Sequence, residues 1–159
     1  GWGQFDARAA TAALRALDDT RLIDEASGWY DQGGGDVDSR HNYFYPLRIR
    51  PGGRTVALSE YGGIAWPMPG HEPPGKTYGY GTAKDKADLT KRYKMLQWKT
   101  ILPQLGRGLS ALVYTQLTDV EDEVNGLFTY DRAALKPEAA AVRSCNAALA
   151  AEFAKVTAK

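Results

Sequence analysis

The fold class is indicated by one stretch of sequence, Thr55-Val56-Ala57-Leu58-Ser59-Glu60-Tyr61-Gly62-Gly63. Residues 55–58 form a short apolar run bounded by turn signals, which predicts a strand buried on both faces of a parallel sheet. Glu60 follows at the point where this strand ends. Because the carboxyl ends of parallel strands carry the active sites of α/β folds, Glu60 is the first candidate for a functional residue.

The rest of the chain alternates between helical and strand patterns. Further strands are predicted near residues 21–23, 37–43 and 109–114, and helices over residues 6–17, 85–104 and 137–156. Residues 65–82 are rich in Gly and Pro and predict a long irregular loop, which is a kind of loop that often carries function. This order of elements favours a parallel α/β sheet.

The composition is that of one globular domain spanning residues 1–159. Hydrophobic residues make up 43% and charged residues 25%, and the net charge is +1. A net charge so near zero argues against a protein whose main task is to bind the phosphate backbone of a nucleic acid. No apolar run approaches the ~18–20 residues that a membrane helix needs. We therefore expect neither a nucleic acid nor a membrane as a partner.

Side chains that hold metals or cofactors are scarce. Cys145 is the only cysteine, so it can form neither an internal disulfide nor a cysteine zinc site, and His41 and His71 are the only histidines. The acidic run 119–126 departs from the EF-hand pattern and is interpreted as a solvated loop. Nucleophile-elbow, Walker and dinucleotide-binding motifs are absent from the sequence. We expect no metal and no cofactor.

Aromatic residues concentrate in one third of the chain. Nine of them lie between Trp29 and Tyr80, many in segments rich in Gly and Pro. Such rings can stack on sugar faces, although they anchor loops equally often. A carboxylate placed like Glu60 is likewise as compatible with a structural ion pair as with catalysis. Taken together, these residues favour a carbohydrate pocket, with Trp29 and Trp66 as candidate sugar-binding side chains.

Two longer motifs resemble glycoside hydrolase family 2. The first is Leu58–Gly63, and the second runs from Tyr114 to Gly126 and ends in Thr129-Tyr130-Asp131-Arg132. Residues 36–43 are similar to the strand on which that family carries a site tyrosine. The resemblance covers nearly the whole chain.

The resemblance implies a retaining β-glycosidase built on a TIM barrel. The nucleophile of the family corresponds to Glu60, and its site tyrosine, which hydrogen-bonds the catalytic carboxylate, corresponds to Tyr43. His41 and Asn42 fall where the family places polar residues that contact substrate. Gln116, within the second motif, is a further candidate for substrate binding.

The length of the chain departs from the family pattern. A complete (β/α)8 barrel takes ~250 residues, and the four strand candidates correspond to strands five to eight, the second half of the barrel. In the family, the acid/base glutamate directly precedes a segment like Gly1-Trp2-Gly3, so we expect that residue to be lost just before Gly1. Glu25 and Glu121 are the carboxylates expected nearest the site, but neither matches the family's acid/base.

A half-barrel leaves two sheet edges and an apolar face open. We therefore expect a homodimer or a companion half-barrel as partner, beside a carbohydrate substrate. The expected activity is that of a β-galactosidase-like fragment, on the frequency of that activity in the family. The alternatives are a non-hydrolytic carbohydrate-binding protein and a purely structural half-barrel that self-associates.

Overall fold

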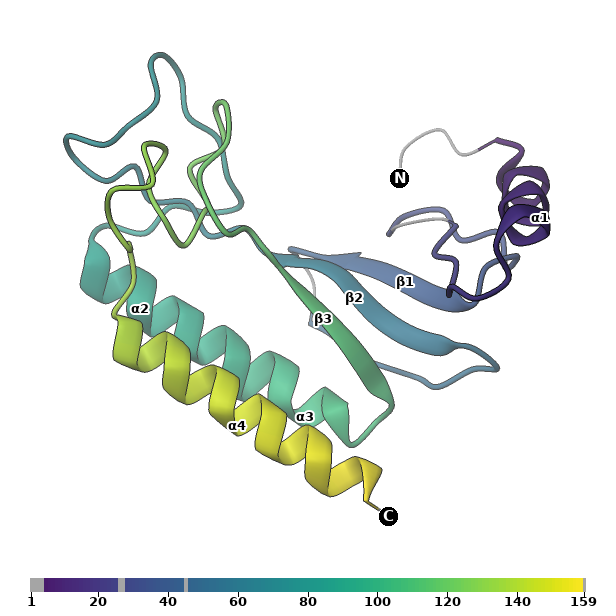
Figure 1. Cartoon of the computed structure of the whole chain (residues 1–159). Coiled ribbons are helices and arrows are strands. Elements are labelled where there is room, and N and C mark those ends of the chain that lie inside the picture. Colours follow the sequence, from purple (N-terminus) through teal and green to yellow (C-terminus); the bar gives the residue numbers. More distant parts are fainter. Residues whose placement is uncertain (1–4, 26–27, 45, 159) are drawn as a thin grey trace.

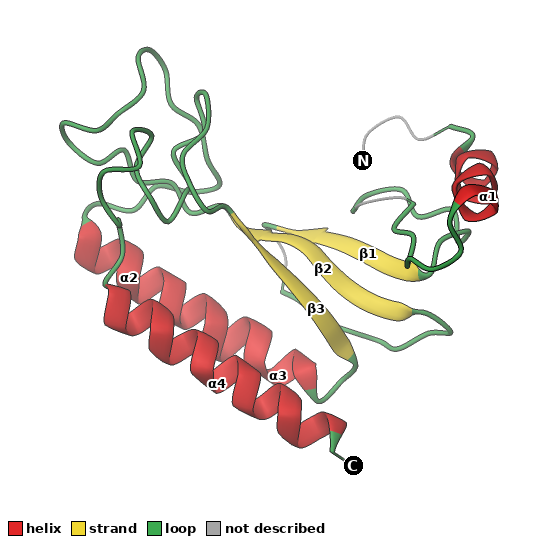
Figure 2. Cartoon of the chain, in the orientation of Figure 1, coloured by secondary structure: helices red, strands yellow, loops and turns green. Residues whose placement is uncertain are grey.

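The computed structural model describes residues 5–25, 28–44 and 46–158. Its elements are, in chain order, α1 (Ala7–Leu17), β1 (Val37–Asn42), β2 (Thr55–Gly62), α2 (Lys86–Met95), η1 (Leu96–Ile101), α3 (Leu102–Leu105), β3 (Leu109–Thr115) and α4 (Ala139–Thr157) (Figures 1 and 2). The π-helical segment η1 joins α2 to α3 without a break. The helix predicted over residues 85–104 is thereby confirmed as one continuous helical stretch.

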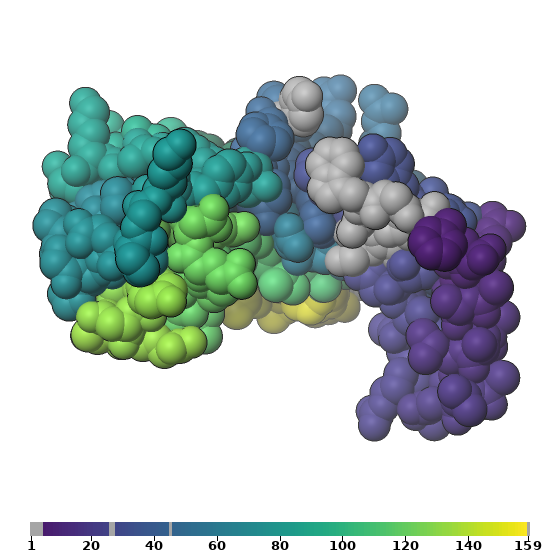
Figure 3. Space-filling model, turned by 90° about the horizontal axis from the view of Figure 1, so that it is seen from above, coloured from purple at the N-terminus to yellow at the C-terminus, as the bar shows by residue number. Residues whose placement is uncertain are grey.

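The three strands form a parallel sheet with β2 in its centre, as the alternation of elements predicts. Helices α2 and α4 run side by side along one face of this sheet (Figure 1). The long loops that follow β2 and β3 gather beyond the carboxyl ends of the strands (Figure 2). Seen from above, this loop cluster and the N-terminal segment with α1 lie at opposite sides of the molecule (Figure 3).

The main core lies between the sheet and the helices. Val56, Leu58 and Tyr61 of β2 are each less than 5% exposed and belong to one cluster with residues of the neighbouring elements, Ile49, Ile101, Leu105 and Leu109. Burying each aliphatic side chain of this kind contributes about 1.5–3 kcal/mol. The strand predicted to be buried on both faces is therefore the centre of both the sheet and the core.

An irregularity in β2 decides where Glu60 points. Leu58 and Tyr61 lie three residues apart and yet both face the core cluster, whereas side chains of a regular strand alternate with a period of two. The register with β1 shifts between Arg40 and His41, and the register with β3 shifts between Leu58 and Tyr61. One extra residue is accommodated here, and Glu60 therefore points away from the core.

The helix starts agree with the sequence in part. Asp85 caps α2, since its side chain accepts a hydrogen bond from the backbone N–H of Asp88 at 2.8 Å. The final helix, predicted from residue 137, begins at Ala139 with Glu138 as its N-cap, so Pro137 lies just before the helix and not in its first turn. Asp6 occupies the N-cap position of α1, but its side chain makes no capping hydrogen bond.

The strand predicted at residues 21–23 is wrong, because this segment is irregular in the structure. The backbone of Ile23 exchanges two hydrogen bonds with Asp36, one to its amide and one to its carboxylate, instead of joining a ladder. The described residues of the connection 43–54 also form no helix. What the described part of the chain establishes is an open three-stranded parallel sheet, not four strands of a closed barrel.

Candidate functional site

Glu60 is held by two side chains from the neighbouring strand end. The Tyr43 hydroxyl donates to Glu60 Oε2 at 2.8 Å, and His41 Nδ1 lies 3.1 Å from the same oxygen. The register of the sheet pairs His41 with Glu60 directly, so the ladder itself brings these groups together. The Glu60 side chain is 42% exposed, and no donor from the described residues is recorded at Oε1. The described residues therefore fix one carboxylate oxygen and leave the other without a donor.

Tyr43 joins the ends of all three strands. It follows β1, its hydroxyl contacts Glu60 of β2, and the same hydroxyl lies 3.0 Å from Oγ1 of Thr115, the last residue of β3. Burial and, to a lesser extent, the Glu60 carboxylate raise the pKa of Tyr43 well above its ordinary value. The phenol is therefore protonated at neutral pH and acts as a donor to Glu60.

His41 is enclosed by Trp29 and Gly28. Its side chain is only 6% exposed, and the Trp29 ring meets it edge-on with the centroids 5.5 Å apart. Gly28 has φ +109°, and a Cβ there would lie 2.1 Å from His41 Cδ2, so the backbone approaches the ring as only glycine allows. Trp29, predicted to bind sugar, thus reaches the site through its contact with His41.

Burial lowers the pKa of His41, although the Glu60 carboxylate opposes this effect. His41 Nε2 is buried and has no hydrogen-bond partner among the described residues. A neutral ring that carries its proton on Nδ1 donates to Glu60 and avoids burying an unpaired N–H at Nε2. His41 is therefore placed to orient Glu60 as a neutral donor.

A stacked pair of tyrosines forms one wall of the site. The rings of Tyr43 and Tyr80 are nearly parallel, with centroids 3.9 Å apart and an interplanar angle of 7°, and Phe44 meets Tyr80 edge-on. Gly63 makes this possible, because a Cβ at this residue would lie 2.5 Å from Tyr80 Cδ2 and 2.9 Å from Tyr43 Cε1. The concentration of aromatic residues in the sequence is thus partly explained by contacts near Glu60.

The other predicted sugar-binding residues lie in different surroundings. Trp66 is 9% exposed and packs in a second cluster with Ala83 and Leu89. Asn42 ends β1 beside Tyr43 and is half-buried. The recorded contacts of Trp66 do not include Glu60, Tyr43 or His41, so its role in binding sugar remains a prediction, as does that of Asn42.

Gln116 belongs to a polar cluster at the end of β3. Its side-chain amide donates to Asn125 Oδ1 at 2.7 Å and lies 3.4 Å from Glu123 Oε2, which also accepts a hydrogen bond from Asn125 at 2.8 Å. Sequence reasoning singled out Gln116 but missed Glu123 and Asn125, which lay in a run interpreted as a solvated loop. Asn125 is in fact completely buried.

A buried ion pair fixes the loops around the site. Lys136 is fully buried, and its ammonium group donates to Asp119 Oδ1 at 2.7 Å, to the carbonyl of Val124 at 2.9 Å and to the carbonyl of Trp66 at 3.1 Å. It therefore ties the loop after β2 to the loop after β3. A lysine next to Pro137 at the start of a predicted helix carries no sequence signal of such burial.

The two carboxylates considered as substitutes for the acid/base are not placed at Glu60. Glu25 accepts hydrogen bonds from the backbone of Gly34 and from the Thr11 hydroxyl, both in the N-terminal segment. Glu121 is exposed at a loop tip with φ +54°. Of these three carboxylates, Glu60 alone contacts Tyr43 and His41 among the described residues.

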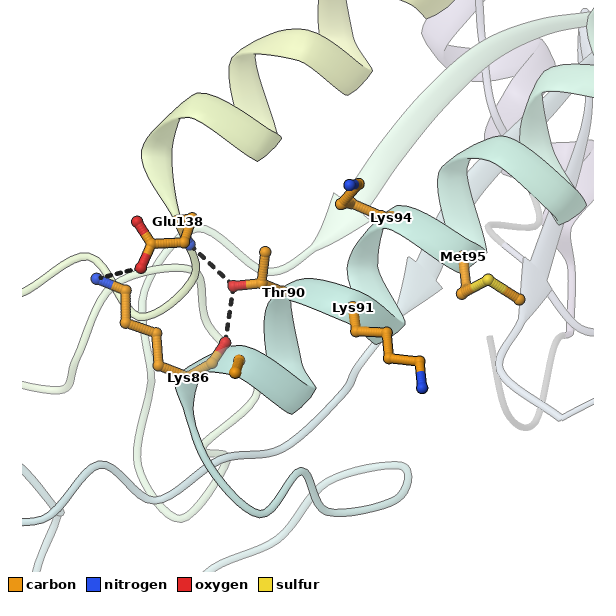
Figure 4. A pocket seen from close by; sticks show the side chains of 7 residues that line it. Lys86, Thr90, Lys91, Lys94, Met95 and Glu138 are labelled. Carbon is orange, nitrogen blue, oxygen red and sulfur yellow. Dashed lines mark hydrogen bonds and ion pairs between the residues drawn. The ribbon is translucent and has the colours of Figure 1, made fainter.

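A groove of about 560 Å³ lies on the helical side, outside the site. It is lined by residues of α2 and of the segment before α4: Lys86, Ala87, Thr90, Lys91, Lys94, Met95 and Glu138 (Figure 4). Lys86 pairs with Glu138 at 3.2 Å, and the Thr90 hydroxyl bridges the backbones of both segments. These contacts join α2 to the start of α4.

No three His, Cys, Asp or Glu side chains of the described residues converge as a metal site would require. No helix in the described part of the chain has the length and apolarity to cross a bilayer. In comparisons with known proteins, neither a protein-family model nor a curated protein matches this chain.

Proposed function

We propose that this chain carries the nucleophile of a retaining β-glycosidase, with Glu60 as the residue that attacks the anomeric carbon. The observation that supports this is the hydrogen bond from Tyr43 to Glu60 Oε2 at the carboxyl ends of adjacent parallel strands. It agrees with the pairing of tyrosine and nucleophile that the resemblance to glycoside hydrolase family 2 implies. In this proposal the open sheet is part of the second half of a TIM barrel.

The arrangement suits the first step of a retaining reaction. The free oxygen of Glu60 attacks the anomeric carbon, and the glycosidic C–O bond breaks with its electron pair leaving on the aglycone oxygen. Tyr43 and His41 donate to the other carboxylate oxygen and keep the attacking one aimed outwards. Water then attacks the anomeric carbon and releases Glu60 as the carboxylate, while a proton of the water passes to the acid/base group.

The aglycone oxygen needs a proton unless it is a good leaving group. No carboxyl group from the described residues other than Glu60 contacts Tyr43 or His41 through a recorded hydrogen bond. We propose that the acid/base glutamate comes from outside this chain. Removing a general acid/base typically costs 10²–10⁴-fold in rate, so hydrolysis of ordinary glycosides by this chain alone should be slow.

A mechanism-based label tests the nucleophile without the acid. The 159-residue chain is incubated with 2-deoxy-2-fluoro glycosides whose leaving group is dinitrophenolate, which departs without protonation. Intact mass and peptide mapping then locate the adduct. We expect an adduct on Glu60 with the galactosyl probe, none in Glu60→Gln, and labelling about 10–100-fold slower in Tyr43→Phe, because a hydrogen bond to a charged group is lost.

The same experiment separates the alternatives. Binding of a free sugar without any adduct would favour a non-hydrolytic carbohydrate-binding protein. Neither binding nor labelling with galactosyl, glucuronyl and mannosyl probes would contradict the proposal and leave a structural role for the sheet. The probe that reacts would identify the sugar.

A further inference from the structure

Glu123 is a partly buried carboxylate with no cationic partner among the described residues. Both hydrogen bonds recorded for it fall on Oε2, from Asn125 at 2.8 Å and from Gln116 at 3.4 Å. Within the described ranges no salt bridge reaches it, and no donor is recorded at Oε1. A carboxylate that two amides hold on one side has unused acceptor capacity on the other, which suits a ligand with hydroxyl donors.

The backbone places Glu123 at the same end of the sheet as Glu60. Thr115, which ends β3, lies within hydrogen-bond distance of the Tyr43 hydroxyl, and the next residue, Gln116, reaches Glu123. One short path of contacts thus leads from Glu60 through Tyr43 and the end of β3 to Glu123.

A second path leads there through the aromatic wall. Tyr80 stacks on Tyr43, and Tyr78 meets Tyr80 edge-on at 5.5 Å. Tyr78 pairs with Glu123 as an isolated parallel bridge, in which its N–H donates to Asp122 and its carbonyl accepts from Val124. Burial and the neighbouring Tyr78 raise the pKa of Tyr80 to about 12, and the Glu123 and Glu60 carboxylates add to this effect. The charges of both carboxylates therefore act on the Tyr80 hydroxyl.

Two paths of contacts thus connect Glu60 and Glu123 at the same end of the sheet. We propose that Glu123 accepts hydrogen bonds from hydroxyl groups of the sugar whose anomeric carbon Glu60 attacks, and that Gln116 and Asn125 are positioning residues that hold Glu123. This inference rests on the proposed function for the nature of the ligand. It also reassigns Gln116, predicted to contact substrate, to a role that acts through Glu123.

The test compares Glu123→Gln with Glu121→Gln, a matched control two residues away in the same loop whose side chain is exposed. Labelling of Glu60 by the reactive 2-fluoro glycoside is measured over a range of concentrations. We expect Glu123→Gln to raise the half-saturating concentration about 10–100-fold, because hydrogen bonds to a charged acceptor are lost. Glu121→Gln should label like the unmodified chain.

A second measurement distinguishes contact with the sugar from a structural effect. Reactive glycosides that each lack one further hydroxyl are tested on both forms. Removal of the hydroxyl that binds Glu123 should weaken saturation strongly in the unmodified chain and by less than twofold in Glu123→Gln, since the contact is already lost. Additive losses at every position, or unchanged saturation in Glu123→Gln, would overturn the assignment of Glu123 while Glu60 stays the nucleophile.

Binding of the unlabelled sugar, followed by NMR, separates this inference from the proposed function. If no adduct forms but the free sugar binds, and binding weakens in Glu123→Gln and not in Glu121→Gln, the nucleophile proposal fails and the role of Glu123 stands. If neither binding nor labelling occurs with any probe, both are overturned.

Discussion

Lys136 Nζ lies 2.7 Å from Asp119 Oδ1, and the side chains of both residues are almost completely removed from solvent. Burial lowers the pKa of Lys136 and raises the pKa of Asp119, while the hydrogen bond between them opposes both shifts. The ammonium group has three acceptors and the carboxylate oxygen also accepts from the Gly126 amide. The cost of burying the two charges is therefore offset by a nearly complete set of hydrogen bonds.

Replacing Lys136 by Met should destabilise the protein by about 3–5 kcal/mol, because it leaves the Asp119 charge buried and uncompensated. The free energy of unfolding from urea titrations measures this effect. Lys155→Met is the matched control, since Lys155 is 70% exposed and its pairing with Glu152 should matter little. A loss below 1 kcal/mol in Lys136→Met would show that the pair does not secure the loops.

Gly28→Ala should displace His41 from Glu60. The new Cβ would collide with the imidazole ring, and the positive φ of Gly28 disfavours alanine in any case. We expect a loss of about 1–3 kcal/mol in stability, together with slower labelling of Glu60. Gly52→Ala is the control, because a Cβ at Gly52 meets nothing within 4 Å. Equal labelling rates in the two variants would show that His41 does not support the reactivity of Glu60.

Acid should weaken the attachment of α1 through Asp36. The carboxylate accepts a hydrogen bond from the Ile23 amide at 2.8 Å and pairs with Arg15, and these contacts, the first being the larger, hold the pKa of Asp36 below its ordinary value. Below about pH 4 the unfolded carboxyl takes up a proton while the native one stays ionised. The unfolded state then binds more protons, so stability falls as the pH falls.

Urea unfolding measured between pH 7 and pH 2.5 checks this sign. Asp36→Asn should be less stable at pH 7 and should lose less stability on acidification than the unmodified chain. Asp122→Asn, which changes an exposed loop carboxylate, should preserve the original pH dependence. A variant Asp36→Asn that parallels the unmodified chain at every pH would contradict the prediction.

The sheet leaves β1 and β3 as edge strands, and Val113 in β3 is 57% exposed. We propose that these edges are covered by a second copy or by a companion half-barrel, because unpaired edges of this kind readily add strands. Light scattering over a wide concentration range should show self-association that Val113→Lys weakens. Leu17→Lys, an equally radical change at an 85% exposed residue of α1, is the control. A monomer mass at all concentrations would exclude the second copy.

Much of the fold could be predicted because its signals are local. The apolar run 55–58 and the turn residues around it indicate a buried strand, and Asp85 and Pro137 mark the starts of helices. Local signals were not sufficient for residues 21–23, where a strand was predicted and the structure has none. Whether their backbone joins a ladder depends on Asp36, whose side chain and amide take up the hydrogen bonds of Ile23 instead.

The same contrast holds for the candidate site. Tyr43 follows β1 and Glu60 lies near the end of β2, two residues beyond the apolar run that predicted this strand, so their proximity follows from the pairing of neighbouring parallel strands and could be anticipated. Glu123 and Lys136 could not be recognised, because their environments are created by loops that meet only in the folded chain. An acidic run looks solvated in the sequence, whereas Asn125 within it is fully buried.

The extra residue in β2 can be tested by a change in chain length. Deleting Ser59 would restore regular alternation, with Leu58 and Tyr61 still directed into the core and the glutamate still directed outwards. The register pairs Arg40 with Leu58 and His41 with Glu60, so the glutamate would stay opposite His41 in the shortened strand. The shortened chain would lose the contact between the Ser59 and Ser39 hydroxyls, and any labelling that it retains would be independent of the bulge.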